Sequence, residues 1–105
     1  YDNRAYFKFV DECREYGINV PVIPGLKPLA SKAQLNVIPH HFHINLPDDL
    51  VQAVEKAKTD ADVRQIGVEW CIQQSKELMK GGALVLHYYT MGKAKSTQAI
   101  AKAVF

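Results

Sequence analysis

The sequence lacks most of the features that assign a short chain to a specialised class of protein. It has two cysteines and no C-x-x-C pair, so neither a dense disulfide framework nor a paired-cysteine motif is present. No apolar run approaches the ~20 residues that a membrane-spanning helix needs. Thirteen Lys and Arg residues nearly balance eleven Asp and Glu residues, which gives no reason to expect nucleic acid or a membrane as a partner. With 48% hydrophobic and 23% charged residues, the chain has the composition of one globular domain.

The first residues and the cysteines indicate the cellular compartment. Residues 1–9, YDNRAYFKF, lack the basic and then apolar order of a signal peptide, so we expect a cytoplasmic protein. The first residue is not Met, and we expect the natural chain to begin upstream. Cys13 and Cys71 lie in predicted helices and are expected to be small buried residues in a reducing compartment. A disulfide or a reactive thiol is the alternative.

Apolar periodicity and capping residues predict five helices and two strands. The helices are expected over residues 3–16, 31–38, 47–58, 60–80 and 94–105, and the strands over 20–26 and 83–89. Strands that alternate with helices imply a parallel sheet and an α/β fold, here in a single domain over residues 1–105 without an internal boundary. Two parallel strands cannot make a stable sheet alone. The sequence therefore indicates a piece of a larger α/β protein, or else a small noncatalytic binding or assembly module completed by a partner or by self-association.

Prolines interrupt the first predicted strand, in the stretch NVPVIPGLKP at residues 19–28. The apolar residues of this stretch are expected to be buried in the strand: Val20, Val22, Ile23 and Leu26. Pro21 and Pro24 each remove a backbone donor, which is costly within a sheet. The two prolines are therefore expected at the entry and the exit of a short strand, with Gly25 allowing the backbone to leave the sheet closely.

The four histidines are candidates for a site. His40, His41 and His43 form the string HHFH, in which His40 and His43 would share a helix face, so a metal site is one interpretation. No Cys, Asp or Glu lies within the string, and solvated or hydrogen-bonded histidines are the interpretation that we prefer. His87 lies near the C-terminal end of the second strand, where open sheets and barrels bind ligands, although a structural role is the simpler alternative.

The loops that follow the two strands are stronger candidates. If both strands belong to one parallel sheet, these loops open on the same rim. Gln34 follows the first strand and offers a donor and an acceptor together, which suits the edge of a heterocyclic ring. Tyr89 and Lys93 follow the second strand, and Lys93 offers a mobile positive charge for a carboxylate or a phosphate. From spacing alone, an ordinary surface residue remains the alternative for both Gln34 and Lys93.

Two strings of the sequence resemble the C-terminal part of methylenetetrahydrofolate reductases. FVDECREYGINVPVIPGLKPLASKAQL is similar to the family's helix ending in C-x-x-x-G-I, its strand V-x-I-I-P-G-I-x-P, and a Gln six residues beyond the last Pro. The matching residues are Cys13, Gly17, Ile18, Ile23, Pro24, Gly25, Pro28 and Gln34. LHYYTMGKAKSTQAI is similar to the family's strand H-F-Y-T-L-N-R over residues 87–93. The resemblance covers nearly the whole chain.

The resemblance implies the C-terminal part of a (β/α)8 TIM barrel, incomplete in this chain, with two main parallel strands and about five helices. It implies an FAD-dependent oxidoreductase in which NADH or NADPH reduces the flavin. The flavin then passes a hydride to 5,10-methylenetetrahydrofolate, giving 5-methyltetrahydrofolate. The implied partners are the folate substrate and the remainder of the barrel, with a homo-oligomer as a further option. We expect the piece alone to be inactive, because the catalytic acid and the flavin-binding residues of the family belong to the part that is missing here.

Three residues match positions at which the family contacts folate. Gln34 matches a glutamine, Lys93 stands where the family has an arginine, and Ile38 stands where some members place an aromatic ring. Lysine keeps the charge but loses the planar fork that grips a carboxylate with two bonds. Ile38 could still pack against a ligand but could not stack on it. Met91 and Gly92 replace the family's Leu-Asn, which changes the loop that precedes Lys93. No catalytic, flavin-binding or metal-binding residue is assigned to this chain.

Overall fold

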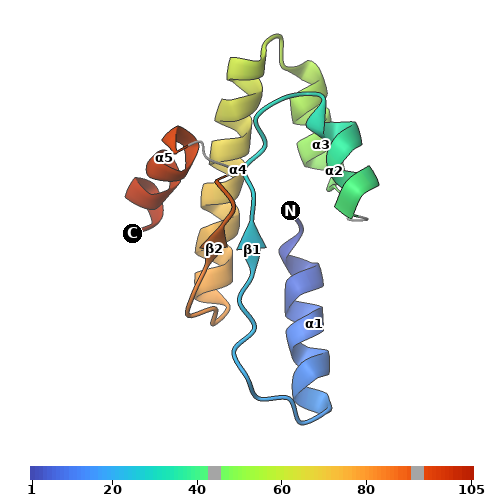
Figure 1. Cartoon of the computed structure of the whole chain (residues 1–105), viewed down its shortest axis with the longest axis vertical. Helices are drawn as coiled ribbons and strands as arrows, with labels where there is room; N and C mark the ends of the chain where they lie inside the picture. Colours follow the sequence, from blue (N-terminus) through green and yellow to red (C-terminus); the bar gives the residue numbers. More distant parts are fainter. Residues whose placement is uncertain (43–45, 91–93) are drawn as a thin grey trace.

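The structure, a computed structural model, describes residues 1–42, 46–90 and 94–105. Within these ranges the chain forms five helices and two very short strands, in the order that the sequence predicts (Figure 1). The elements are α1 (Asn3–Glu15), β1 (Gly25–Leu26), α2 (Gln34–Phe42), α3 (Asp48–Lys56), α4 (Asp60–Lys80), β2 (His87–Tyr88) and α5 (Lys95–Val104). The α/β class is therefore confirmed, with helices as the dominant element.

Local capping residues set the ends of the two long helices. The Asp2 carboxylate accepts a hydrogen bond from the backbone N–H of Arg4 and begins α1, and Gly17, at φ +77°, follows its end. The Thr59 hydroxyl accepts a hydrogen bond from the N–H of Asp62 and begins α4. These ends follow the sequence prediction because each depends on residues within one turn of the helix.

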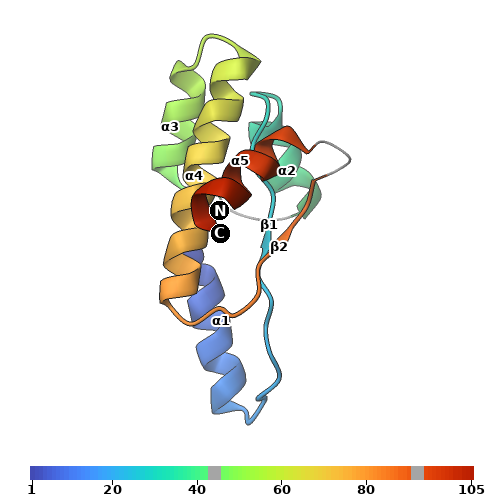
Figure 2. The same ribbon diagram turned by 90° about the vertical axis from the view of Figure 1, so that its left-hand side faces the viewer.

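The two strands pair in parallel, as predicted. Gly25 lies opposite His87 and Leu26 opposite Tyr88. Because side chains alternate along a strand, Leu26 and Tyr88 point to one face, where they pack with α4 and α5. Figure 2 shows α1 and α4 on one side of the strand pair, with none of the described helices lying over its other side. Gly25 and His87 are exposed on that open side.

The strands are much shorter than predicted. The expected strand over residues 20–26 pairs only at its end, and Val20 and Ile23, which were expected to be buried, are 63% and 53% exposed. In the expected strand over residues 83–89, Leu84 is 95% exposed. The ladder stops because prolines lack donors and because the described residues provide no further strand to pair with. Pro24 still contributes as an acceptor, since its carbonyl oxygen receives the N–H of His87 at 3.0 Å.

Two hydrophobic clusters form the core, and α4 contributes to both. The first, called the upper cluster, joins α2, α3 and the start of α4 through Leu29, Ile38, Leu50, Val54, Ala57 and Val63. The second, called the strand cluster, joins the strands to α4 and α5 through Leu26, Cys71, Leu78 and Ile100. The helix predicted over residues 31–38 ends later than expected, because α2 continues past Pro39 to Phe42.

The chain exposes more surface than its mass would require. Its accessible surface is 7362 Å², whereas an average monomeric protein of 11.8 kDa exposes about 5,900 Å². The excess, about 1,450 Å², exceeds the ~800 Å² that one partner buries in a standard interface. The molecule is also elongated, with extents of 47 × 29 × 23 Å. None of the helices in the described ranges has both the length and the apolar character to cross a bilayer.

Candidate functional site

The parallel pairing brings the loops after β1 and β2 to the same edge of the sheet. The first of these loops runs from Lys27 to Gln34, the first residue of α2, and the second begins at Tyr89. The predicted rim is therefore present in the described part of the chain. Lys93, the predicted cationic partner, lies outside the described residues, as do Met91 and Gly92.

The side-chain carbonyl oxygen of Gln34 stabilises the first rim loop. Its Oε1 accepts a hydrogen bond from the N–H of Ala30 at 2.6 Å and lies 3.4 Å from the N–H of Ser31. Among the described residues, no acceptor is paired with the Gln34 NH₂ group. Because the carbonyl oxygen is used within the loop, the group that remains for a ligand is a hydrogen-bond donor.

Gly67 of α4 packs directly against the backbone of the same loop at Leu29. A methyl group at this position would overlap the carbonyl oxygen of Leu29 and lie 2.8 Å from its backbone nitrogen. Leu29 is buried in the upper cluster, so the helix and the loop backbone are in direct contact. Sequence reasoning missed Gly67, although a glycine inside a long predicted helix is itself a signal of close packing.

Ile38, the predicted packing contact for a ligand, belongs to the upper cluster and is 3% exposed. Its side chain is thus part of the hydrophobic core in this structure, while Gln34 lies one turn earlier on α2 and is only partly buried. A contact between Ile38 and a ligand stays a prediction, and it would require the side chain to be uncovered.

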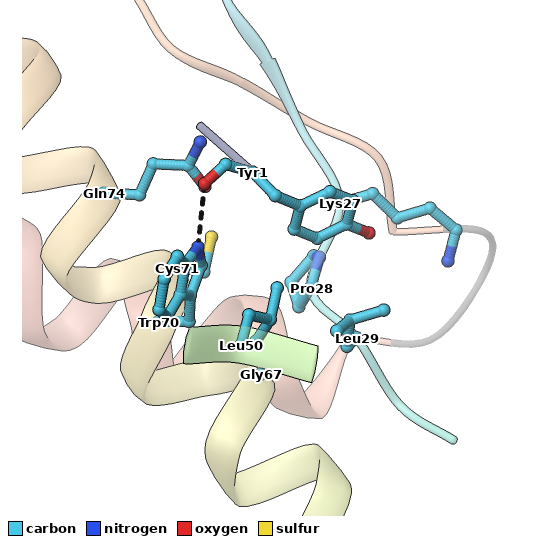
Figure 3. Close-up of a pocket in the computed structure, with 9 residues that line it drawn as sticks. All are labelled: Tyr1, Lys27, Pro28, Leu29, Leu50, Gly67, Trp70, Cys71 and Gln74. Carbon is cyan, nitrogen blue, oxygen red and sulfur yellow. Dashed lines mark hydrogen bonds between the residues drawn. The ribbon is translucent and has the colours of Figure 1, made fainter. Parts of the chain in front are cut away.

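A tightly filled pocket lies between the rim loop and α4. Figure 3 shows the ring of Tyr1 between Trp70 and Lys27, with the indole nitrogen of Trp70 donating a hydrogen bond to the Tyr1 carbonyl oxygen at 3.0 Å. The Tyr1 hydroxyl is buried and has no hydrogen-bond partner in the described part of the chain. Its burial raises the pKa of the phenol, which therefore stays protonated at neutral pH.

Both cysteines are buried and unbridged, as the preferred interpretation expected. Burial raises the pKa of the Cys71 thiol to about 11, and the nearby hydroxyl of Ser75 only partly offsets this effect. A thiol with a raised pKa is a poor nucleophile near neutral pH, because little thiolate is present. The structure therefore disfavours the disulfide and gives no support to a reactive thiol at Cys71.

The histidines do not form a metal centre within the described residues. No group of three His, Cys, Asp or Glu side chains in that part of the chain could hold a metal ion. His40 is exposed on α2, and His43 lies outside the described residues. His87 is also exposed, and its ring meets the ring of Tyr89 edge to face, with centroids 4.6 Å apart at an interplanar angle of 70°.

A second, open groove of about 380 Å³ lies beside the start of α1. Its lining includes the carboxylates of Asp2, Asp49 and Glu77. The amide nitrogen of Asn3 donates to Glu77 and to the Gln74 carbonyl oxygen, each at 3.0 Å. The one cation of the lining, Arg4, is paired with Asp2 at 2.9 Å, so the groove keeps a net negative charge that does not suit a phosphate group.

Helices against one side of a parallel strand pair, with polar side chains at its carboxyl edge, define a member of the α/β class with a candidate ligand rim. A profile described as methylenetetrahydrofolate reductase matches residues 1–104, and the chain belongs to this family. The family resemblance seen in the sequence is thereby confirmed.

Curated relatives carry the same name. The chain is 32% identical over 106 residues to the probable methylenetetrahydrofolate reductase (NADPH) of Caenorhabditis elegans, covering 99% of this chain and 16% of that protein. It is 31% identical over 101 residues to methylenetetrahydrofolate reductase (NADH) 1 of Arabidopsis thaliana, covering 95% and 17%. It is 28% identical over 101 residues to the 5,10-methylenetetrahydrofolate reductase of Escherichia coli, covering 95% and 34%. The chain thus spans only 16% to 34% of the length of these relatives.

Proposed function

We propose that this chain is the part of a cytoplasmic methylenetetrahydrofolate reductase that carries one side of the folate site. The complete enzyme would reduce 5,10-methylenetetrahydrofolate to 5-methyltetrahydrofolate, with FAD as its cofactor and NADH or NADPH as the reductant. The reductant stays open because the relatives' names give NADPH in one case and NADH in another. The observation that carries the proposal is the parallel pairing of β1 and β2, which puts the Gln34 loop and Tyr89 on one rim in a chain of this family.

The partner that this piece requires is the remainder of a (β/α)8 barrel. Such a barrel has eight parallel strands, and the described residues supply two. Two observations support the proposal: the excess exposed surface, and the open side of the strand pair, where apolar residues such as Ile23 and Val85 are more than half exposed. In a closed barrel, this side would face the interior.

Within the rim, we assign Gln34 the role of a donor to folate. Its NH₂ group would meet a carbonyl oxygen or ring nitrogen of the substrate, because its own carbonyl oxygen is held by the loop. Lys93 would supply a positive charge for a substrate carboxylate, and Ile38 an apolar contact. None of these roles involves proton transfer, so the chain's contribution is binding and orientation.

The described residues of this chain do not fit FAD. A diphosphate needs backbone N–H groups or cationic side chains around it, whereas the open groove presents three carboxylates and one cation, Arg4, which is paired with Asp2. The pocket under the rim loop is filled by Tyr1, Trp70 and their neighbours. The flavin therefore belongs to the part of the enzyme outside this chain, and the piece alone should not catalyse the reaction.

Two preparations test the proposal. The purified chain should show no flavin absorbance after incubation with FAD, and no NADH- or NADPH-dependent reduction of methylenetetrahydrofolate. A chimera, in which this chain replaces the matching 101 residues of the Escherichia coli relative, should regain that activity. Stoichiometric FAD on the chain alone would overturn the assignment of the flavin. A chimera that folds and binds flavin but does not reduce the folate would overturn the assignment of the folate site.

The noncatalytic module remains the second candidate, because the same excess surface would also suit self-association. It predicts a stable dimer of the purified chain in analytical ultracentrifugation and an inactive chimera. The reductase proposal predicts a marginally stable chain alone and an active chimera, so the two measurements together separate the candidates.

A further inference from the structure

Tyr89, the residue after β2, reaches across to Gly25 of β1 and meets it with one edge of its ring. A methyl group built at Gly25 would lie 2.6 Å from Cε2 of Tyr89, 3.1 Å from its hydroxyl oxygen and 3.3 Å from Cζ. The distances show that the ring occupies the space that any side chain at position 25 would need. The Tyr89 backbone is fixed as well, because its N–H donates to the Leu26 carbonyl oxygen at 2.8 Å.

Gly25 is not required for an unusual backbone conformation. Among the described glycines, only Gly17 and Gly82 have positive φ, so an L-residue could adopt the backbone of Gly25. The absence of a side chain at this position is explained by the ring above it. This differs from the sequence interpretation, which gave Gly25 the task of letting the backbone leave the sheet.

His87 contacts the same ring from a second direction. It is the ladder partner of Gly25 and lies two residues before Tyr89, so its side chain points to the same side of the extended chain. The two rings meet edge to face at 4.6 Å, an arrangement that aromatic pairs favour. The Tyr89 ring therefore rests with one edge against Gly25 and packs against the ring of His87, while 50% of the residue's surface stays exposed at the rim.

We propose that Gly25 and His87 are positioning residues that fix the orientation of the Tyr89 ring, against which the planar ring system of the substrate stacks. This inference rests on the proposed function, because it takes the ligand of the rim to be a folate. A half-exposed aromatic ring held in one orientation suits stacking against a planar heterocycle. Gly25 and His87 act through Tyr89 and do not touch the substrate themselves.

A double-mutant cycle tests the positioning. In the chimera, Gly25→Ala should raise the KM for methylenetetrahydrofolate about tenfold, a loss of about 1.4 kcal/mol, with kcat changed less than about twofold. In a Tyr89→Leu background, the same substitution should change KM by less than about twofold, because the ring that it displaces is gone. An equal effect of Gly25→Ala in both backgrounds would show that Gly25 acts through the backbone and would sink the inference.

A second pair of variants decides the role of His87. His87→Phe keeps an aromatic edge against Tyr89 and should retain the native KM, whereas His87→Ala should raise it severalfold. Equal KM values for the two variants would contradict this positioning role. If Gly25→Ala does not fold, this pair alone decides the inference.

The geometry is also tested in the chain alone, without any activity. The free energies of unfolding of Gly25→Ala and Tyr89→Leu should be non-additive, because the two groups compete for one space. Additive free energies of unfolding would overturn the contact between the Tyr89 ring and Gly25, even if the chimera were active. Non-additive values together with an inactive wild-type chimera would instead count against the proposed function and leave that contact intact.

Discussion

Gly67→Ala perturbs the contact between α4 and the rim loop with a single methyl group. The methyl would overlap the carbonyl oxygen of Leu29 and lie 2.9 Å from its carbonyl carbon. These are backbone atoms, so no side chain can rotate away, and either α4 or the loop must move. Overpacking of this kind costs about 1–3 kcal/mol, and an overlap with backbone lies at the upper end of that range.

Part of that cost is offset by helix propensity. Alanine stabilises a helix interior by about 1 kcal/mol relative to glycine. The net effect of Gly67→Ala is therefore a destabilisation of about 2 kcal/mol, which corresponds to a fall in Tm of about 8–16 °C for a domain of this size. Trp70 lies one turn further along α4, so its fluorescence reports the transition directly, with circular dichroism as the second probe.

Ala61→Gly is the matched control, since Ala61 is exposed in the first turn of the same helix. It should lower stability by no more than about 1 kcal/mol, from propensity alone. A Gly67→Ala variant as stable as the native chain, or more stable, would refute the contact between α4 and the rim loop.

Two further substitutions follow from the site. Gln34→Glu keeps an acceptor for the loop N–H groups and should leave the Tm of the chain nearly unchanged while weakening folate binding in the chimera. Gln34→Leu should also cost about 1–2 kcal/mol of stability, and equal folate affinity in both variants and the native chimera would exclude the donor role. For Cys71, the thiol is protonated in both states below pH 9.0, and between pH 9.0 and about 11 only the unfolded chain loses its proton. The free energy of unfolding should therefore fall by up to about 2.7 kcal/mol across that range, and Cys71→Ala should remove this part of the decline. The raised pKa values of Tyr1 and Tyr88 add to the decline above pH 10.0 in both proteins, so Cys71→Ala is compared with the native chain between pH 9.0 and 10.0, where an unchanged decline would contradict the shift.

The helices could be predicted from the sequence because their signals are local. Asp2 and Thr59 cap the helices that follow them, and the glycines after α1 and α4 end those helices, all within a few residues. The strands were predicted too long because pairing depends on neighbours far away in the chain. Val20 and Leu84 have the composition of strand residues but find no further strand among the described residues.

The candidate site could be predicted only in part. The parallel direction of the two strands and the position of Gln34 follow from the sequence, so the sequence predicts that the two loops share one rim. The orientation of the Gln34 amide, the burial of Ile38 and the contact of Tyr89 with Gly25 depend on three-dimensional contacts that spacing does not encode. In each case the missing information was which side of an element faces the core.

The participation of α4 in both clusters has a consequence for how the chain opens. Val63 near its start is buried in the upper cluster, and Leu78 near its end is buried in the strand cluster. The 21 residues of α4 span about 31 Å, so a single rigid helix links the two halves of the molecule. In hydrogen exchange, backbone amides in the middle of α4 should open only with the whole chain, whereas those of residues 19, 20, 22, 23 and 84–86 should exchange almost freely. This difference in exchange rate would mean that α4 unfolds last. The backbone beside the two strands would be the first part to become available for pairing with further strands.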